Sequence, residues 1–304
     1  MMQWELLEQI EFHPEEIACV RQTENRFGEA VEALAQKYMC EGERCPEPYP
    51  VDGRMQALQR ATDAMEHAAA LDPQRQNDRV LGLLFWLHCI PYAEKLYEKF
   101  AISREIFRDT MMDITYKMRE CRQLYGQCGV FTPWIFLVFD LKVFALGRLQ
   151  FEIRALDREI PAGNGQVLPK GTRVCSCHIP ASGKLTREQC MASFSQAGTF
   201  FTSAVQEGIL PIICDSWMLY PPYIRNVFPE NSNLQMFAGL FQVYDRLSTG
   251  QDFSDGWRVF GKSDTENVQD LPHDTTLQRN FIRYIQNGGD FGYGLGLRMH
   301  RVTE

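Results

Sequence analysis

The spacing of apolar residues changes near residue 147, and this change constrains the fold more than any other feature of the sequence. Before it, apolar residues recur every three or four positions, as in the run from Ala30 to Tyr38, which is the period of a helix. After it, Leu149, Phe151 and Ile153 alternate with polar residues, which is the period of a strand. The chain is therefore expected to be helical in its first half and to form a sheet in its second.

The first half contains residues that are typical of the starts and ends of separate helices. Ser103 can cap a helix over residues 104–124, and Gly126 is placed to end it. The three prolines within Cys45 to Pro50 exclude a helix there, because proline lacks a backbone donor and restricts the residue before it. The aromatic run around Pro133 to Phe136 predicts another buried segment. We expect an all-α domain over residues 1–145.

The second half predicts a mixed sheet. Strands are expected over residues 148–155 and 173–179, and the Asn-Gly turn within Pro161 to Gly165 favours an antiparallel pair. After a loop, Thr186 and Gln189 have the spacing of a capping box and predict a helix. The apolar run 210–214 then predicts a strand parallel to its predecessor, since strand, helix and strand follow one another.

The rest of the chain is expected to add elements to this sheet. We predict helices over 233–241 and 275–287, and strands over 242–247, 257–260 and 291–297. Glycine recurs at positions 292, 294 and 296. A phosphate-binding glycine loop requires a helix after it, so these glycines favour close packing of a strand. The fold class is α+β or α/β, with the mixed-sheet domain over residues 146–304.

Charge and composition exclude several classes of protein. The 304 residues carry a formal net charge of −8, which disfavours binding to nucleic acid or to anionic membranes. The segment from Ala101 to Met118 could be drawn as a helix-turn-helix, but it lacks a basic recognition face. The ten cysteines are too sparse for a disulfide scaffold, and no apolar run approaches the ~20 residues that cross a bilayer. We expect a cytoplasmic protein with reduced thiols, no membrane span and no secretion signal.

A candidate anion site follows the predicted strand that ends at His178. A strand that runs into a small-residue loop and a helix start directs unpaired backbone N–H groups, and the positive end of the helix dipole, into the loop. Lys184 and Arg187 add positive charge there. An ordinary capped turn between strand and helix is the alternative, and the residues alone leave it open.

Four segments together resemble a known family. They are 146–152 (LGRLQFE), His178-Ile179-Pro180 with Gly183 and Leu185, Ser216-Trp217-Met218-Leu219 with Pro221, and Asn231-Ser232-Asn233-Leu234. In this order they resemble bacterial GNAT-like acyltransferases, in which a helical N-terminal domain precedes a GNAT-like domain. Typical GNAT loops have an Arg or Gln followed by two spaced glycines, whereas this loop has only Gly183.

The resemblance implies an acyl-CoA donor, acetyl-CoA or a longer acyl-CoA, transferred to an N or O acceptor. It places the coenzyme pyrophosphate on the loop and helix start, at Ala181, Ser182, Gly183, Lys184, Thr186 and Arg187. A small-molecule or peptide acceptor is expected in a cleft beside residues 215–223. The acyl chain, the acceptor and the oligomeric state stay open.

Acyl transfer needs a base for the acceptor and an acid for the departing thiolate. Glu152, His178 and Asp215 are candidate bases from their places on or after strands, although each could equally form a structural contact. Tyr223 is the nearest match to the tyrosine acid of many GNAT enzymes, and Tyr220 is equally close in sequence.

Two other interpretations compete with catalysis at this site. Cys175, Cys177 and His178 have metal-binding side chains, but alternation places the cysteines and the histidine on opposite faces, so no metal is expected. A non-catalytic protein that retains the fold, and uses its helical half for a ligand or a protein partner, is the alternative to an enzyme.

Overall fold

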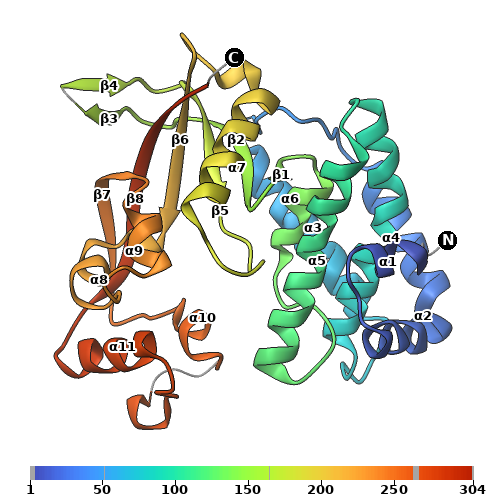
Figure 1. Ribbon diagram of the computed structural model, residues 1–304. Coiled ribbons are helices and arrows are strands. Elements are labelled where there is room, and N and C mark those ends of the chain that lie inside the picture. The colour runs from blue at the N-terminus through green and yellow to red at the C-terminus, as the bar shows by residue number, and fades with distance from the viewer. Residues whose placement is uncertain (1–3, 51, 164, 263–266, 303–304) are drawn as a thin grey trace. The chain divides into compact units, whose positions relative to one another are not determined.

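The computed structural model describes residues 4–50, 52–163, 165–262 and 267–302 (Figure 1). Internal contacts divide the chain into two compact units, Met1–Ala145 and Leu146–Glu304. The first is helical up to the short strand β1 (Val143–Leu146), and the second contains a mixed sheet, so the predicted fold class is confirmed. Within the described ranges, no helix has the length and apolar character required to cross a membrane.

The first unit consists of helices joined by short connections. Ser103 Oγ accepts a hydrogen bond from the Ile106 N–H at 3.2 Å, and Gly126 ends the same helix with a φ of 67°, so both predicted boundaries are confirmed. The connection Cys45 to Pro50 contains no helix, also as predicted. The helices are α1 (Trp4–Gln9), α2 (Pro14–Cys40), α3 (Gly53–Ala69), α4 (Asp78–Lys99), α5 (Arg104–Tyr125) and α6 (Phe136–Phe139), with a 3-10 turn η1 at Pro133–Ile135.

Helix α4 is the centre of this unit. Every residue from Val80 to Ile90 is buried, which is expected of a helix that is apolar all round. It packs against α2, α3, α5 and α6, and the Trp86 ring stacks on Phe139 with 5.1 Å between ring centroids. The helical half therefore has a hydrophobic core of its own.

A buried ionic group joins the Cys45 to Pro50 connection to the end of α6. Asp140 Oδ1 lies 3.0 Å from Arg44 Nε, close enough for an ion pair although the direction of the N–H does not meet hydrogen-bond geometry. Asp140 Oδ2 accepts hydrogen bonds from Arg60 and from the Tyr49 hydroxyl, each at 3.0 Å. Both the Arg44 and the Asp140 side chains are 2% exposed, so neither charge is compensated by water.

Asp140→Ala should lower the free energy of unfolding of the helical unit by about 3–5 kcal/mol, because it leaves the buried Arg44 guanidinium without its carboxylate. Urea unfolding followed by circular dichroism at 222 nm measures this. Asp63→Ala is the matched control, because the Asp63 carboxylate accepts only an exposed hydrogen bond from Gln59. An equal loss in both variants would contradict the prediction.

The second unit is built on a six-stranded sheet with the order β1-β2-β5-β6-β8-β7. Strands β2 and β5, β6 and β8, and β7 and β8 pair antiparallel, whereas β5 and β6 are parallel. The antiparallel and parallel pairs predicted for the first strands are thus confirmed. The strands are β2 (Leu149–Ala155), β5 (Arg173–His178), β6 (Ile209–Ser216), β7 (Gln242–Gly250) and β8 (Phe291–Arg301).

The parallel pair is short, and the two strands separate after it. Only Cys175 with Ile212 and Ser176 with Ile213 are in register between β5 and β6. Beyond these pairs β5 continues to His178 and β6 to Ser216, while β6 stays paired with β8 to its end. The carboxyl ends of β5 and β6 therefore point to one edge of the sheet without bonding to each other.

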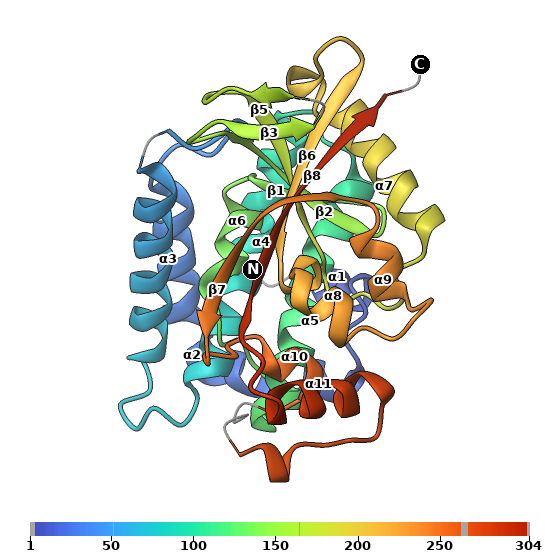
Figure 2. The ribbon, with the colours of Figure 1, turned by 90° about the vertical axis from the view of Figure 1, so that its left-hand side faces the viewer.

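The two faces of the sheet have different coverings. Helix α7 (Arg187–Phe200) lies along one face, where Phe194 meets Phe151 of β2 at 6.2 Å between ring centroids; both views show α7 beside the sheet (Figures 1 and 2). The opposite face carries a hairpin of β3 (Ile160–Gly163) and β4 (Gln166–Leu168), which forms a separate two-stranded sheet. This hairpin contains the predicted turn, of which Asn164 lies outside the described residues.

The remaining elements follow the prediction with one exception. Helices α9 (Asn233–Ala238) and α11 (Thr276–Gln286) and strands β7 and β8 occur where expected. The strand predicted over 257–260 is wrong, because this segment is the short helix α10 (Gly256–Phe260). Helix α8 (Pro221–Asn226) and the 3-10 turns η2 (Thr202–Ala204), η3 (Trp217–Leu219) and η4 (Val268–Asp270) complete the unit.

The glycines of β8 serve close packing, as predicted. A Cβ atom at Gly294 would collide with the backbone of Leu219, and one at Gly296 would lie 2.6 Å from the Leu219 side chain. The turn η3 that follows β6 therefore lies directly against β8. This contact fixes the chain just beyond the carboxyl end of β6.

Candidate functional site

The loop between β5 and α7 has the features of an anion site. Thr186 caps α7 by accepting a hydrogen bond from the Gln189 N–H at 3.2 Å. Within the described residues, the backbone N–H groups of 181–188 have no hydrogen-bond acceptor. Gly183 has a φ of +93° and open space where a side chain would be. The start of a 14-residue helix and a row of free donors thus face outward from the edge where β5 and β6 separate.

Arg148 binds the other side of this loop. Its guanidinium donates to the carbonyl oxygens of Pro180 at 3.1 Å, Gly183 at 2.7 Å and Lys184 at 3.1 Å. Its backbone N–H donates to Ser193 Oγ, on α7, at 2.8 Å. The sequence did not predict this role, because no residue pattern indicates a hydrogen bond to backbone carbonyls more than 30 residues away.

Three cationic side chains lie near the start of α7. Lys184 and Arg187 are exposed, as a site for a solvent-borne anion requires. Arg298 of β8 is the third, and was not predicted. Its Nη2 lies 3.2 Å from Met191 Sδ on α7, and its pKa is lowered by burial and by the charge of Arg187. Glu188 is exposed in the same turn and offsets part of this charge, so the three cations leave an excess of positive charge here although the whole chain is acidic.

On the sheet face opposite α7, polar side chains form a row across β2 and β5. Glu152 is opposite Ser176 in the register, and His178 is two residues further along β5 on the same face. His178 Nε2 lies 3.4 Å from Glu152 Oε2, a distance that forms an ion pair when the imidazole is protonated, but without hydrogen-bond geometry. The Glu152 side chain is 3% exposed, so this carboxylate is in the interior.

Ser176 is a member of the row that sequence reasoning missed. It is 3% exposed and is opposite Glu152 in the register, so its hydroxyl lies on the same face as the carboxylate and the imidazole. The alternation that identified Glu152 and His178 also places Ser176 on their face, so the signal was available.

Asp215 extends the row onto β6. Asp215 is two residues beyond Ile213, and Ile213 is in register with Ser176. The register partner of Asp215 on β8 is Leu295. The pKa of its carboxyl is raised because surrounding protein atoms displace water, although part of the side chain is exposed. The charges of Arg154, His178 and Arg158 oppose this shift. Asp215 and His178 are therefore close enough to influence each other.

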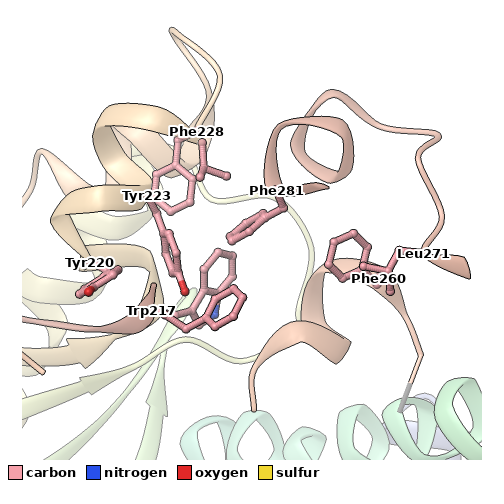
Figure 3. Close-up of a cluster of buried hydrophobic side chains, with 9 residues drawn as sticks. Trp217, Tyr220, Tyr223, Phe228, Phe260, Leu271 and Phe281 are labelled. Carbon is pink, nitrogen blue, oxygen red and sulfur yellow. The ribbon is translucent and has the colours of Figure 1, made fainter. Parts of the chain in front are cut away.

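Tyr223 belongs to a different environment, an aromatic cluster around Trp217 and Phe281 (Figure 3). It is 1% exposed, its hydroxyl oxygen accepts the Gly292 N–H at 3.3 Å, and burial raises its pKa. Its ring lies 4.9 Å, between centroids, from those of Tyr220 and Phe281. Tyr220 is bonded elsewhere, since its hydroxyl donates to Asp290 Oδ2 at 2.5 Å.

A small, open pocket of about 10 Å³, room for about one water molecule, lies beside this cluster, just beyond the carboxyl end of β6. Its walls are aromatic and its rim carries two carboxylates; the lining residues include Trp217, Tyr223, Phe253, Tyr293, Asp252 and Asp255. Tyr293 is two residues from Leu295, the register partner of Asp215, so it points to the same face of the sheet. The pocket and the polar row thus have one strand face in common, although no residue of the row lines the pocket within the described residues.

The cysteines near the site do not converge with His178. Cys177 is opposite Phe151 and Cys175 opposite Ile153, on the face that α7 covers, whereas His178 shares the other face with Glu152. All ten cysteines lie in the described ranges and are free thiols. Across those ranges, no group of three or more His, Cys, Asp or Glu side chains is arranged to hold a metal ion.

The two halves match two known domain families. Residues 1–141 match an N-acyltransferase N-terminal domain, and residues 143–298, more than half of the chain, match a GNAT-like C-terminal domain. The chain belongs to this family of two-domain N-acyltransferases. The predicted family, and the predicted acyltransferase class, are thereby confirmed. A comparison with curated proteins finds no match.

Solved structures share the fold across the whole chain. An acyltransferase in complex with decanoyl-CoA and teicoplanin is 19% identical, with a TM-score of 0.69 over 97% of this chain and 86% of the other. An acyltransferase variant in complex with octanoyl-CoA gives the same values. An acyltransferase in complex with decanoyl-CoA is 17% identical, with a TM-score of 0.62 and complete coverage of both chains.

The raised pKa of Asp215 predicts how stability depends on pH. The folded state holds the proton more tightly than the unfolded chain, so stability should fall as the pH rises from the ordinary Asp value of about 3.9 through the raised folded pKa. Asp215→Asn removes this ionisation and should be more stable relative to the wild type near pH 7 than near pH 4. Urea unfolding of both proteins across this range measures the difference, and a constant difference would contradict the prediction.

Proposed function

We propose that the chain transfers an acyl group from an acyl-CoA to an amine, with the loop 181–187 holding the coenzyme pyrophosphate. The observation that carries this proposal is the row of free N–H donors at 181–188, at the edge where β5 and β6 separate. Family membership supports the reaction type. The acyl-CoA found in the structural neighbours supports the donor class.

The donor site suits a phosphate group for electrostatic reasons. Backbone donors at a helix start stabilise an anion without adding a mobile charge, and the helix dipole adds to this effect. Lys184, Arg187 and Arg298 supply the positive potential that an otherwise acidic protein needs in order to attract a coenzyme. Ala181, Ser182, Gly183 and Thr186 contribute backbone or small side chains, which let the phosphates approach closely.

The thioester of a donor held there can reach the opening between β5 and β6, and from there the polar row. An amine acceptor enters as an ammonium and must lose a proton before it attacks the thioester carbonyl. We assign the proton transfer to Glu152, with His178 as its neighbour at 3.4 Å and Asp215 as a second carboxylate in the row. The Ser176 hydroxyl lies on the same face and is a further polar group in the row.

The departing thiolate requires a proton, and Tyr223 is the proposed donor. The phenol is protonated at neutral pH, as an acid requires, although burial raises its pKa and so makes it a weaker acid. Its oxygen accepts the Gly292 N–H, which leaves its own hydrogen available to donate. Tyr223 also lines the cavity beyond β6, so a substrate in that cavity would contact it.

The cavity next to Asp215 is the proposed acceptor site. Aromatic walls at Trp217, Phe253 and Tyr293, with Asp252 and Asp255 at the rim, favour a cationic group over an anionic one. A small-molecule amine or the amino group of a peptide has this chemistry. The pocket holds about one water molecule, about 10 Å³, so an acceptor would bind over its aromatic walls rather than inside it.

Gly183→Glu should abolish saturable binding of acetyl-CoA and longer acyl-CoAs in calorimetry. The substitution places a carboxylate in the phosphate loop, at a φ of +93° that disfavours any side chain. Gly171→Glu is the matched control. Gly171 has a φ of +87° and the same open space, but it precedes β5 at its opposite end. The control should bind the coenzyme as the wild type does.

The outcomes of this titration separate the two functions. Binding that is lost only in the Gly183 variant supports the donor site and justifies a screen of amine acceptors. Binding without turnover for any acceptor favours a non-catalytic protein that retains the fold. A wild-type protein that binds no acyl-CoA would overturn the proposal.

Glu152→Gln should lower kcat by about 10²–10⁴-fold, because a general base contributes in this range. The affinity for acyl-CoA should stay within about twofold, because Glu152 is opposite Ser176 in the strand register and is not part of the phosphate loop. Steady-state kinetics with saturating donor, combined with calorimetry, gives both values. Glu230→Gln, an exposed change between α8 and α9, is the control for loss of a carboxylate. An unchanged kcat would remove Glu152 from the mechanism.

A further inference from the structure

The loop 180–184 has no regular secondary structure that would hold its backbone in one conformation. It is neither helix nor strand, it contains a single glycine, and its backbone N–H groups from 181 onward have no acceptor within the described residues. A loop of this kind is expected to sample many conformations, because little opposes its backbone entropy. Yet an anion site needs its donors held in one arrangement before the ligand arrives.

Arg148, which lies outside the loop, holds its backbone by hydrogen bonds. Its three donor nitrogens reach three different carbonyls: Nη1 to Pro180, Nη2 to Gly183 and Nε to Lys184, at 3.1, 2.7 and 3.1 Å. A planar guanidinium fixes the relative directions of these bonds. Because each carbonyl points toward Arg148, the adjoining peptide N–H groups are directed away from it.

The backbone of Arg148 is also held in place by hydrogen bonds. Its backbone N–H and that of Leu149 both donate to Ser193 Oγ on α7, at 2.8 and 3.2 Å. Gly147 makes this approach possible, since a Cβ atom there would lie 2.9 Å from the same oxygen. Arg148 therefore connects the start of β2, the body of α7 and the loop that precedes α7.

We propose that Arg148 is a positioning residue that holds the loop 180–184 in its anion-binding shape, without itself contacting the pyrophosphate. This inference rests on the proposed function. A lysine cannot replace the arginine, because a single ammonium group cannot donate along three fixed directions to separate carbonyls. The positive charge at position 148 is secondary to its geometry.

A donor that lacks pyrophosphate distinguishes this role from a general loss of structure. In Arg148→Lys and Arg148→Ala, the Kd for acyl-CoA and its KM should rise about tenfold or more. Turnover of the matching acyl thioester of N-acetylcysteamine, which has no phosphate, should stay within about twofold of the wild type. An equal loss with both donors, or a lysine variant that binds acyl-CoA as the wild type does, would overturn the proposal.

A second measurement needs no ligand. Lys184 and Arg187 are exposed trypsin sites within and just after the loop. Native protein should be cut slowly there, and both Arg148 variants should be cut at least about fivefold faster, while melting temperatures stay close to that of the wild type. Unchanged cleavage would reject the bracing role even if the protein proves not to bind acyl-CoA. Faster cleavage without coenzyme binding would reject only the proposed function.

Discussion

The short parallel pairing of β5 and β6 is the constraint on which the candidate site depends. Two register pairs hold the strands together, and β6 then remains with β8 while β5 ends at His178. Had the pairing continued, backbone groups at the edge of the sheet would bond to each other. Because they separate, the loop before α7, the polar row and the cavity beyond β6 all open at one edge. The glycines of β8 maintain this arrangement by admitting Leu219 against the sheet.

The spacing of the hydrophobic residues along the chain predicted much of this fold. The alternation from Leu149 onward identified β2 and the side of the sheet that carries Glu152, and the capping residues Ser103 and Thr186 identified helix starts. The segment 257–260 was assigned wrongly because four residues, three of them apolar, fit a strand and a helical turn equally well. In α10 the preceding Asp255 pairs with Arg258 at 2.8 Å, a spacing that favours the helical turn.

The candidate site was less accessible to sequence reasoning. His178 and Glu152 could be placed on one face by alternation, but their separation of 3.4 Å depends on the antiparallel register of β2 and β5. Arg298 is more than 100 residues beyond Arg187, and only the sheet order brings their charges together. Long-range pairing decides such contacts, and no local spacing encodes it.

Charge is separated along the open edge of the second unit. Lys184, Arg187 and Arg298 outnumber Glu188 near the start of α7, whereas Asp252, and Asp255 in its pair with Arg258, line the cavity beyond β6. An anionic donor and a cationic acceptor would each be attracted to one end of this edge and repelled from the other. The two reactants would then approach the polar row from opposite sides. The net charge of −8 does not oppose this, since the field near a site depends on the nearest groups once salt screens the distant ones.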